Sequence, residues 1–275
     1  MTGAGRVDTP PRMARAAWAW EGLRRNADYR MAFRARPRAG VSVVDLATGA
    51  TLMRARRRYA DAENFGLLTF ADPDRTGSEV PVFWHPDRLK GTLEVRLSPL
   101  TRSERSGECD HELIDLSRLA IPRHVFDAAD GSRTILLGGC RIWLQLHCPR
   151  PMVCGERGHL GIRLNTPVAM GRSLDTAQQL LSLYRAQRGK PTLIGRAPRT
   201  KRIHDGLVAH DVWTGFERPR GGLRDIATAL VGEGRVRADW TSGSRYLKDA
   251  ARRARDRGFR FVGGEYARLL TQKAI

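Results

Sequence analysis

Residues 242 to 261, SGSRYLKDAARRARDRGFRF, place alanines among arginines, and this combination limits how the chain can fold. At about 100° per residue, one side of a helix over this run collects small and apolar residues. They are Leu247, Ala250, Ala251, Ala254 and Phe261. A helix whose buried side is mostly alanine can lie very close to its neighbours. The run therefore predicts a tightly packed helical unit in this part of the chain.

The other side of the same helix is cationic. A spacing of three, four and three residues puts one stripe away from the apolar side, formed by Arg245, Lys248, Arg252 and Arg255, with Arg253 beside it. Such a stripe can bind phosphates, or it can be an ordinary solvated surface. The helix alone does not decide between these interpretations.

The net charge of the chain favours the first interpretation. It is +19 over 275 residues, which indicates a polyanionic partner, nucleic acid first and an acidic membrane surface second. The excess is uneven, because residues 196–275 contain 18 Lys and Arg against nine Asp and Glu. Nearly half of the net charge thus lies in the last eighty residues.

The first part of the chain predicts a tail and a helical module. Residues 1–12 carry Gly and Pro without periodicity, so we expect a disordered tail. Residues 13–60 are expected to be helical and to begin with two short helices. Trp20 lies on the apolar face of the first helix, Tyr29 anchors the second, and Pro37 ends it.

Residues 61–190 predict a β-rich domain with a closing helix. Leu93, Val95 and Leu97 alternate with polar residues, and turn dipeptides at 130–131 and 138–139 flank another strand. We expect a small antiparallel sheet here. The closing helix is expected over 173–189, with an apolar face formed by Leu174, Ala177, Leu181 and Tyr184.

Residues 196–275 predict a helix-turn-helix-like domain. A support helix over 202–216 precedes a short helix whose apolar face is formed by Leu223, Ile226, Ala227 and Leu230. A connector, RVRADW at 235–240, leads to the cation-rich helix, an order typical of helix-turn-helix domains. A basic three-helix bundle without DNA binding is the alternative. The expected fold class is α+β: N-terminal helices, a central small antiparallel β domain and this C-terminal helical domain.

The sequence gives no sign of membrane insertion or of enzyme chemistry. No stretch approaches about 18 uninterrupted apolar residues, and we expect a soluble, cytoplasmic protein. P-loop, HExxH and GxSxG patterns are absent from the sequence, and no DxD-like metal constellation is recognised, so we expect no catalytic residues, no cofactor and no metal. His85 and Arg88 match the His-x-x-Arg of tyrosine recombinases, but no suitably placed tyrosine follows, and a loop role for His85 is favoured.

Two other groups of residues are weaker candidates. Cys140, Cys148 and Cys154, with His147 and His159, lack any recognised zinc-ligand spacing, so free thiols are favoured. Trp143 could belong to an aromatic platform for RNA or single strands. The expected sheet lacks alternating exposed aromatics and cations, however, so Trp143 is expected in the core.

Three segments of the chain resemble a known family. They are WEGLRRNADYR near the start, FGLLTFADP with the following PVFWHPDRL, and the closing run from Leu223 to Leu270. Together they resemble RovC-like bacterial transcriptional regulators, which include activators of type VI secretion and activators encoded on integrative conjugative elements. The likeness extends from about Trp18 to Leu270 and is strongest at both ends. The central part matches least, so a ligand or redox role for its cysteines is open.

The resemblance implies a sequence-specific, double-stranded DNA-binding transcription activator. Its implied partners are duplex DNA, further copies of the chain and RNA polymerase, and its implied location is cytoplasmic and nucleoid-associated. The residues that would meet DNA are Ser244, Arg245, Lys248, Arg252, Arg253, Arg255 and Arg224. Arg245 and Lys248 would approach base edges, because recognition helices read with their N-terminal turns, and the arginines that follow would meet phosphates.

Other functions stay open at this point. They are RNA or single-strand binding, a recombination accessory role on a mobile element, and a scaffold whose charge keeps it soluble.

Overall fold

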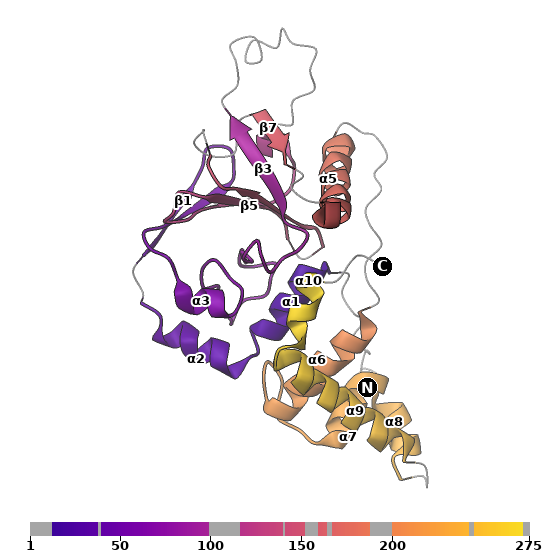
Figure 1. Cartoon of the computed structure of the whole chain (residues 1–275). Coiled ribbons are helices and arrows are strands. Elements are labelled where there is room, and N and C mark those ends of the chain that lie inside the picture. Colours follow the sequence, from indigo (N-terminus) through magenta and orange to yellow (C-terminus); the bar gives the residue numbers. More distant parts are fainter. Residues whose placement is uncertain are drawn as a thin grey trace.

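A computed structural model describes residues 13–37, 40–98, 116–139, 141–151, 159–163, 167–187, 200–241 and 245–271. A bent, mixed sheet of seven strands lies above the N-terminal helices, and helices α6 to α9 gather at the lower right of the view (Figure 1). The predicted α+β class is confirmed. The predicted tail over 1–12 lies outside the described residues.

The two N-terminal helices form where the sequence predicts them. α1 spans Arg15–Leu23 and α2 spans Ala27–Ala35. Asn26 separates them and caps α2, because its Oδ1 accepts a hydrogen bond from the Tyr29 backbone N–H at 3.0 Å. Trp20 and Tyr29 are fully buried, and their rings meet edge to face at 5.7 Å. These helices are therefore part of the core rather than a separate module.

The prediction that residues 13–60 are helical is wrong for their second half. β1 (Val41–Asp45) and β2 (Thr51–Ala55) form an antiparallel hairpin here, and a short helix, α3 (Ala60–Asn64), follows. β-branched residues favour the strand conformation over 41–45. Gly49, at φ 78°, allows the tight turn between the strands.

The remaining strands are β3 (Leu93–Ser98), β4 (Arg123–Asp127), β5 (Arg133–Gly138), β6 (Trp143–Cys148) and β7 (His159–Ile162). Their order is β1-β2-β4-β5-β6-β3-β7. β2 pairs with β4, and β3 with β6, in parallel, so the prediction of an antiparallel sheet is wrong at these two junctions. Turn dipeptides identify hairpins between neighbours in sequence but carry no information on strands that pair across long connections.

The central strands are buried on both faces. Phe126, Leu136 and Trp143 pack towards the N-terminal helices. Val125, Ile135 and Leu144 point to the opposite face. There they meet α5 (Pro167–Gln187) and the short turn η1 (Leu116–Arg118). The predicted burial of Trp143 in the core is confirmed.

A buried glutamine fixes residues 80–89 across the sheet. Gln145 Oε1 accepts from the Trp84 backbone N–H at 3.0 Å, and Gln145 Nε2 donates to the Trp84 carbonyl at 2.7 Å. The amide also donates to Thr92 Oγ1 at 3.2 Å, so its polar atoms are satisfied within the core. Residues 82–84 are therefore buried, and they also pair with residues 66–68 through a single antiparallel bridge between Leu67 and Trp84.

The predicted apolar face of α5 is partly wrong. Leu180 and Tyr184 are buried, whereas Leu174 and Leu181 are exposed. The buried stripe also includes Thr176, whose hydroxyl donates to the Gly91 carbonyl at 2.8 Å. Because this polar residue lies inward, apolar spacing alone selects the wrong stripe.

The C-terminal part forms a helical unit of α6 (Lys201–Thr214), α7 (Leu223–Val231), α8 (Glu233–Asp239) and α9 (Tyr246–Val262). A 3-10 turn, η2 (Glu265–Ala267), and α10 (Arg268–Thr271) return to α1 (Figure 1). Ile226 and Ala227 of α7 are buried against Ala251 and Ala254 of α9 in one cluster. The predicted apolar faces of α7 and α9 are confirmed.

The predicted connector at 235–240 is mostly helical, because it belongs to α8. Glu233 pairs with Arg237 at 2.8 Å, and Arg235 with Asp239 at 3.8 Å, both at the i,i+4 spacing that supports a helix. Val236 lies on the buried side of α8. A whole helix therefore separates α7 from α9 where the helix-turn-helix motif has a short turn, and that motif stays a prediction.

Two glycines allow α6 and α9 to cross in contact. Gly206 and Gly258 meet at the crossing, where a Cβ on Gly258 would overlap the carbonyl oxygen of Gly206 and lie 3.0 Å from His210 Cβ. Any side chain at Gly258 would force the helices apart.

A buried ionic network joins α1 to the helical unit. Arg25 Nε and Nη2 donate to the two carboxylate oxygens of Asp211 at 2.8 and 2.9 Å. Glu21 accepts from both Arg24, at 2.6 Å, and Arg25, at 2.7 Å. Arg24, fully buried, also donates to Glu217 at 2.7 Å. The two arginines thus bind carboxylates from both parts of the chain.

The ring of Phe216 completes this junction. The guanidinium carbons of Arg24, Arg25 and Arg30 lie 5.0 to 5.3 Å from its centroid. Phe216 follows the end of α6 at Gly215 rather than extending the helix, which corrects the predicted end at 216. Its place beyond the helix lets one ring contact three cations from the N-terminal helices.

The crossing of α6 and α9 makes a testable prediction. Gly258→Ala should lower the free energy of unfolding by about 1 to 3 kcal/mol, because the added methyl has no space. Gly234→Ala, in α8 with no atom near the new methyl, should be neutral or stabilising. Urea denaturation of both variants measures the difference. Equal stabilities would contradict the tight crossing.

The network also predicts a dependence on pH. Burial opposes ionisation of Asp211, but hydrogen bonds from His210 and Arg25 outweigh it and hold the pKa of this carboxyl below its ordinary value. Its stabilisation is therefore present above the unfolded-state pKa of about 3.9 and is lost as pH falls through the lower folded-state pKa.

Asp211→Asn should lower the free energy of unfolding at pH 7 by about 3 kcal/mol, because Arg25 loses a buried partner. The variant should also lose less stability than the wild type between pH 5 and 3. Urea denaturation across this range tests both points, with Glu233→Gln, which breaks an exposed pair, as the control. An unchanged acid slope in Asp211→Asn would refute the lowered pKa.

Candidate nucleic-acid interface

The outward side of α9 carries exposed cations close to its N-terminal end. Arg245 occupies the residue before the helix and is exposed, as are Arg252 and Arg253. The opposite side is buried through Leu247, Ala251 and Ala254. This division agrees with the sequence prediction.

Two acidic residues share the outward side and alter its charge. Asp249 lies 3.4 Å from Arg252, and Asp256 lies 3.0 Å from Arg255. At seven residues apart, they occupy the same stripe of the helix. The cationic surface is therefore partly neutralised by its own helix, which the prediction did not include.

Two of the predicted contact residues lie over aromatic rings. Arg255 lies over Trp213 of α6 at 4.7 Å, and only 27% of its side chain is exposed. Lys248 lies over Trp240 at 5.7 Å. Both cations are held against the protein, so their positions are more restricted than those of Arg245 and Arg253.

The other two predicted contacts lie outside α9. Arg224 is exposed on the first turn of α7. Ser244 lies outside the described residues.

The structure brings together arginines that the prediction omitted. Arg257 is half-buried on α9, and burial lowers the pKa of its guanidinium. The nearby charges of Arg202, Arg253 and Arg260 lower this pKa further, whereas Asp205 raises it. The spacing 253, 257 and 260 marks a second stripe on α9 and could have been found in the sequence. The contribution of Arg202 from α6 depends on the helix crossing and could not.

The structure places the residue considered for RNA binding in the core and those considered for recombination in a turn. Trp143, at 9% exposure, cannot offer its face to bases. His85 lies in a turn, where its Nδ1 accepts from the Asp87 backbone N–H at 3.3 Å. Arg88 is exposed in the same turn.

The zinc candidates are only partly described. Cys148 is a buried free thiol, and His147 Nδ1 lies 3.2 Å from Thr134 Oγ1. Cys140, Cys154 and the side chain of His159 lie outside the described residues. Within the described part of the chain, no three His, Cys, Asp or Glu side chains gather closely enough to hold a metal ion.

Among the described helices, none combines the length and apolar character needed to span a membrane.

Comparison with known families indicates a regulatory class of protein. Residues 5–63 match a family model described as a Proteobacterial transcriptional regulator-like domain. Within the described residues the match covers α1, α2, β1, β2 and α3. A comparison with curated proteins finds no match. The N-terminal part of the chain is thus similar to a domain of bacterial transcription regulators, and it includes Arg24 and Arg25 at the junction with the helical unit.

The difference between the surroundings of the Arg255 and Arg253 side chains leads to a testable prediction. Arg255→Ala should lower the free energy of unfolding by about 1 kcal/mol, because it removes the contact with Trp213. Arg253→Ala, whose side chain forms no ion pair with another described residue, should stay within about 0.5 kcal/mol of the wild type. Urea denaturation of the two variants provides the comparison. The restricted position of Arg255 would be disproved by equal unfolding free energies.

Proposed function

We propose that this chain is a sequence-specific, double-stranded DNA-binding transcription regulator that acts through the outward side of α9. One observation carries the proposal: exposed cations project from one side of a helix whose other side is packed into a helical unit. A match to a transcriptional regulator-like domain elsewhere in the same chain supports it.

The proposed contacts divide by position along α9. Arg245 and Lys248, at its N-terminal end, approach base edges, because this end of a recognition helix enters the major groove. Arg252, Arg253 and Arg255 meet phosphates, and Arg224 and Ser244 add contacts from outside the helix. Since rings hold Arg255 and Lys248, and Asp249 pairs with Arg252, Arg245 and Arg253 are the contacts proposed on α9 whose charge is least engaged within the described part of the chain.

The finer parts of the proposal rest on the resemblance to RovC-like regulators. They are activation rather than repression, target genes for secretion or mobile elements, homo-oligomer formation, and contact with RNA polymerase. The charge of +19 supports a nucleoid-associated role, because a polyanion attracts such a chain over long range.

A binding experiment tests the proposal. Genome-wide binding of the wild-type chain first supplies a preferred duplex. Arg245→Ala should then weaken binding to that duplex by about 1 to 3 kcal/mol and relax the preference at one base pair, measured by fluorescence anisotropy against single-base variants of the site. Arg253→Ala should weaken binding to preferred and scrambled duplexes alike.

Competition distinguishes the remaining alternatives. Preference for RNA of equal length over duplex DNA would replace the proposal with RNA binding. Little affinity for any duplex at about 150 mM salt would instead support the scaffold function.

A further inference from the structure

Four arginines from two helices lie near the crossing of α6 and α9. Arg253, Arg257 and Arg260 follow each other at spacings of four and three residues, so they lie along one side of α9. Arg202, in the first turn of α6, lies one turn before Gly206, which faces the backbone of Arg257 and Gly258 at the crossing. The charges of Arg202, Arg253 and Arg260 all act on Arg257. We call these four residues the arginine cluster.

The cluster has little counter-charge among the residues that the structure describes. The carboxylate that acts on Arg257 is Asp205, which already accepts from Lys201 Nζ at 3.0 and 3.2 Å. Arg202, Arg253 and Arg257 form no ion pair with any other residue in the described part of the chain. Like charges held together in this way repel each other, and an anion between them would remove the repulsion.

One atom of the cluster also lacks a hydrogen-bond partner. Arg257 Nε is buried and donates to no acceptor within the described residues. A buried donor without an acceptor costs about 1 to 3 kcal/mol, so its presence calls for an explanation. Since this atom is buried, the Arg257 side chain must shift outward before an oxygen of a bound anion can accept its hydrogen bond.

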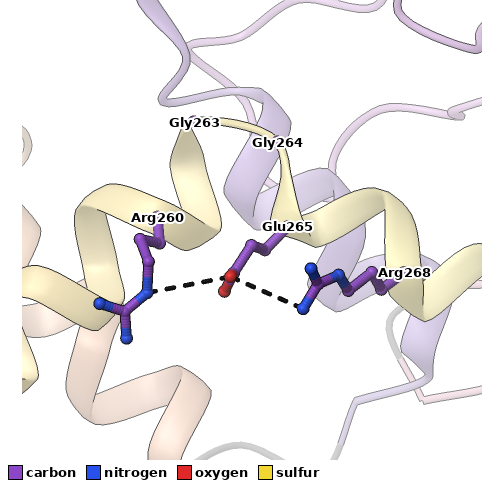
Figure 2. A pocket seen from close by; sticks show the side chains of 5 residues that line it. All are labelled: Arg260, Gly263, Gly264, Glu265 and Arg268. Atoms are coloured by element: carbon purple, nitrogen blue, oxygen red, sulfur yellow. Dashed lines mark ion pairs between the residues drawn. The ribbon is translucent and has the colours of Figure 1, made fainter.

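The far end of the cluster borders a shallow hollow. Gly263 and Gly264 form part of its lining, and Arg260 and Arg268 reach towards Glu265 between them (Figure 2). The closest distances to the Glu265 carboxylate are 3.8 Å from Arg260 and 3.7 Å from Arg268, too long for hydrogen bonds. Glu265 therefore orients Arg260 loosely and neutralises part of the charge at this end.

We propose that the arginine cluster binds the phosphodiester backbone of double-stranded DNA along the C-terminal half of α9, while the N-terminal end of the helix reads bases. This inference rests on the proposed function and extends it. Guanidinium groups bind phosphate oxygens through paired, charge-assisted hydrogen bonds. The backbone contact thus involves Arg202, Arg257 and Arg260, which the sequence prediction left out.

The dimensions of the cluster favour a strand backbone over a single phosphate. Residues 253 to 260 span about 10 Å of helix, which matches the axial rise of about three nucleotides. A lipid surface is disfavoured, because membrane-binding helices combine such cations with a broad apolar face. The exposed large apolar side chains of α9 are Tyr246 and Phe259, which do not form such a face, and the Phe259 ring also lies 5.1 Å from His210 between ring centroids.

The test measures duplex affinity as a function of salt, with the full-length chain and fluorescence anisotropy. Arg202→Gln and Arg257→Gln should each weaken binding to every duplex by the same factor, roughly tenfold. Each should also reduce the slope of log affinity against log salt by about 1. Arg34→Gln, an exposed arginine on α2 outside the helical unit, changes the net charge equally and should leave both quantities unchanged.

A variant with the opposite expected effect distinguishes the loss of a DNA contact from the loss of folding. Glu265→Gln frees Arg260 and Arg268 and should strengthen binding to all duplexes severalfold, which a damaged fold cannot do. Arg245→Ala should change base preference and leave the effect of the cluster variants intact.

The outcomes separate the two proposals. If the wild type binds duplex while the cluster variants keep its affinity and salt slope, the phosphate site is wrong and the proposed function stands. If the wild type binds no duplex, both are wrong. If the cluster variants lose binding to anionic vesicles or RNA but not to duplex DNA, the phosphate site is overturned in favour of that ligand.

Discussion

The paired arginines at the end of α1 connect the two parts of the chain on which function depends. Arg24 and Arg25 bind Glu21 on their own helix together with Asp211 and Glu217 from the helical unit. Buried charges are tolerated only where partners satisfy them, and separation of the two parts would remove the partners of Asp211 and Glu217 and leave one arginine beside Glu21 uncompensated. The regulator-like segment and the cationic helices are thus fixed in one arrangement.

α9 combines structural and surface roles through its composition. Alanine and glycine let it lie against α6 and α7, and this close approach brings Arg202 of α6 next to the arginines of α9. Larger residues on the inner side would move the helices apart and disperse that charge. The small residues of the core therefore determine the charge density of the surface.

Periodicity in the sequence was sufficient for much of the helical structure, although it missed α8 and the β1–β2 hairpin. It identified α1, α2, α7 and α9 and the buried side of each of the last two, because these features depend on neighbours along the chain. It failed where a distant segment decides the outcome. The parallel pairing of β2 with β4 and the inward position of Thr176 both require partners that no local pattern encodes.

In the candidate site, too, some features follow from helical spacing and others depend on distant segments. Exposure of Arg245 and Arg253 followed from helical spacing, and the acids Asp249 and Asp256 could have been included by the same reasoning. The aromatic contacts of Arg255 and Lys248 could not, since Trp213 and Trp240 belong to other elements. Ion pairs and ring contacts between helices thus decide which cations are available.

The C-terminal end of α9 contacts α1 at Gly22. Gly22 leaves room for Phe261 and Tyr266, and a methyl group there would lie 2.8 Å from atoms of both. α9 continues without interruption from this contact to Tyr246, a length of about 25 Å. One continuous helix therefore sets the distance between its contact with α1 and the exposed end next to Arg245.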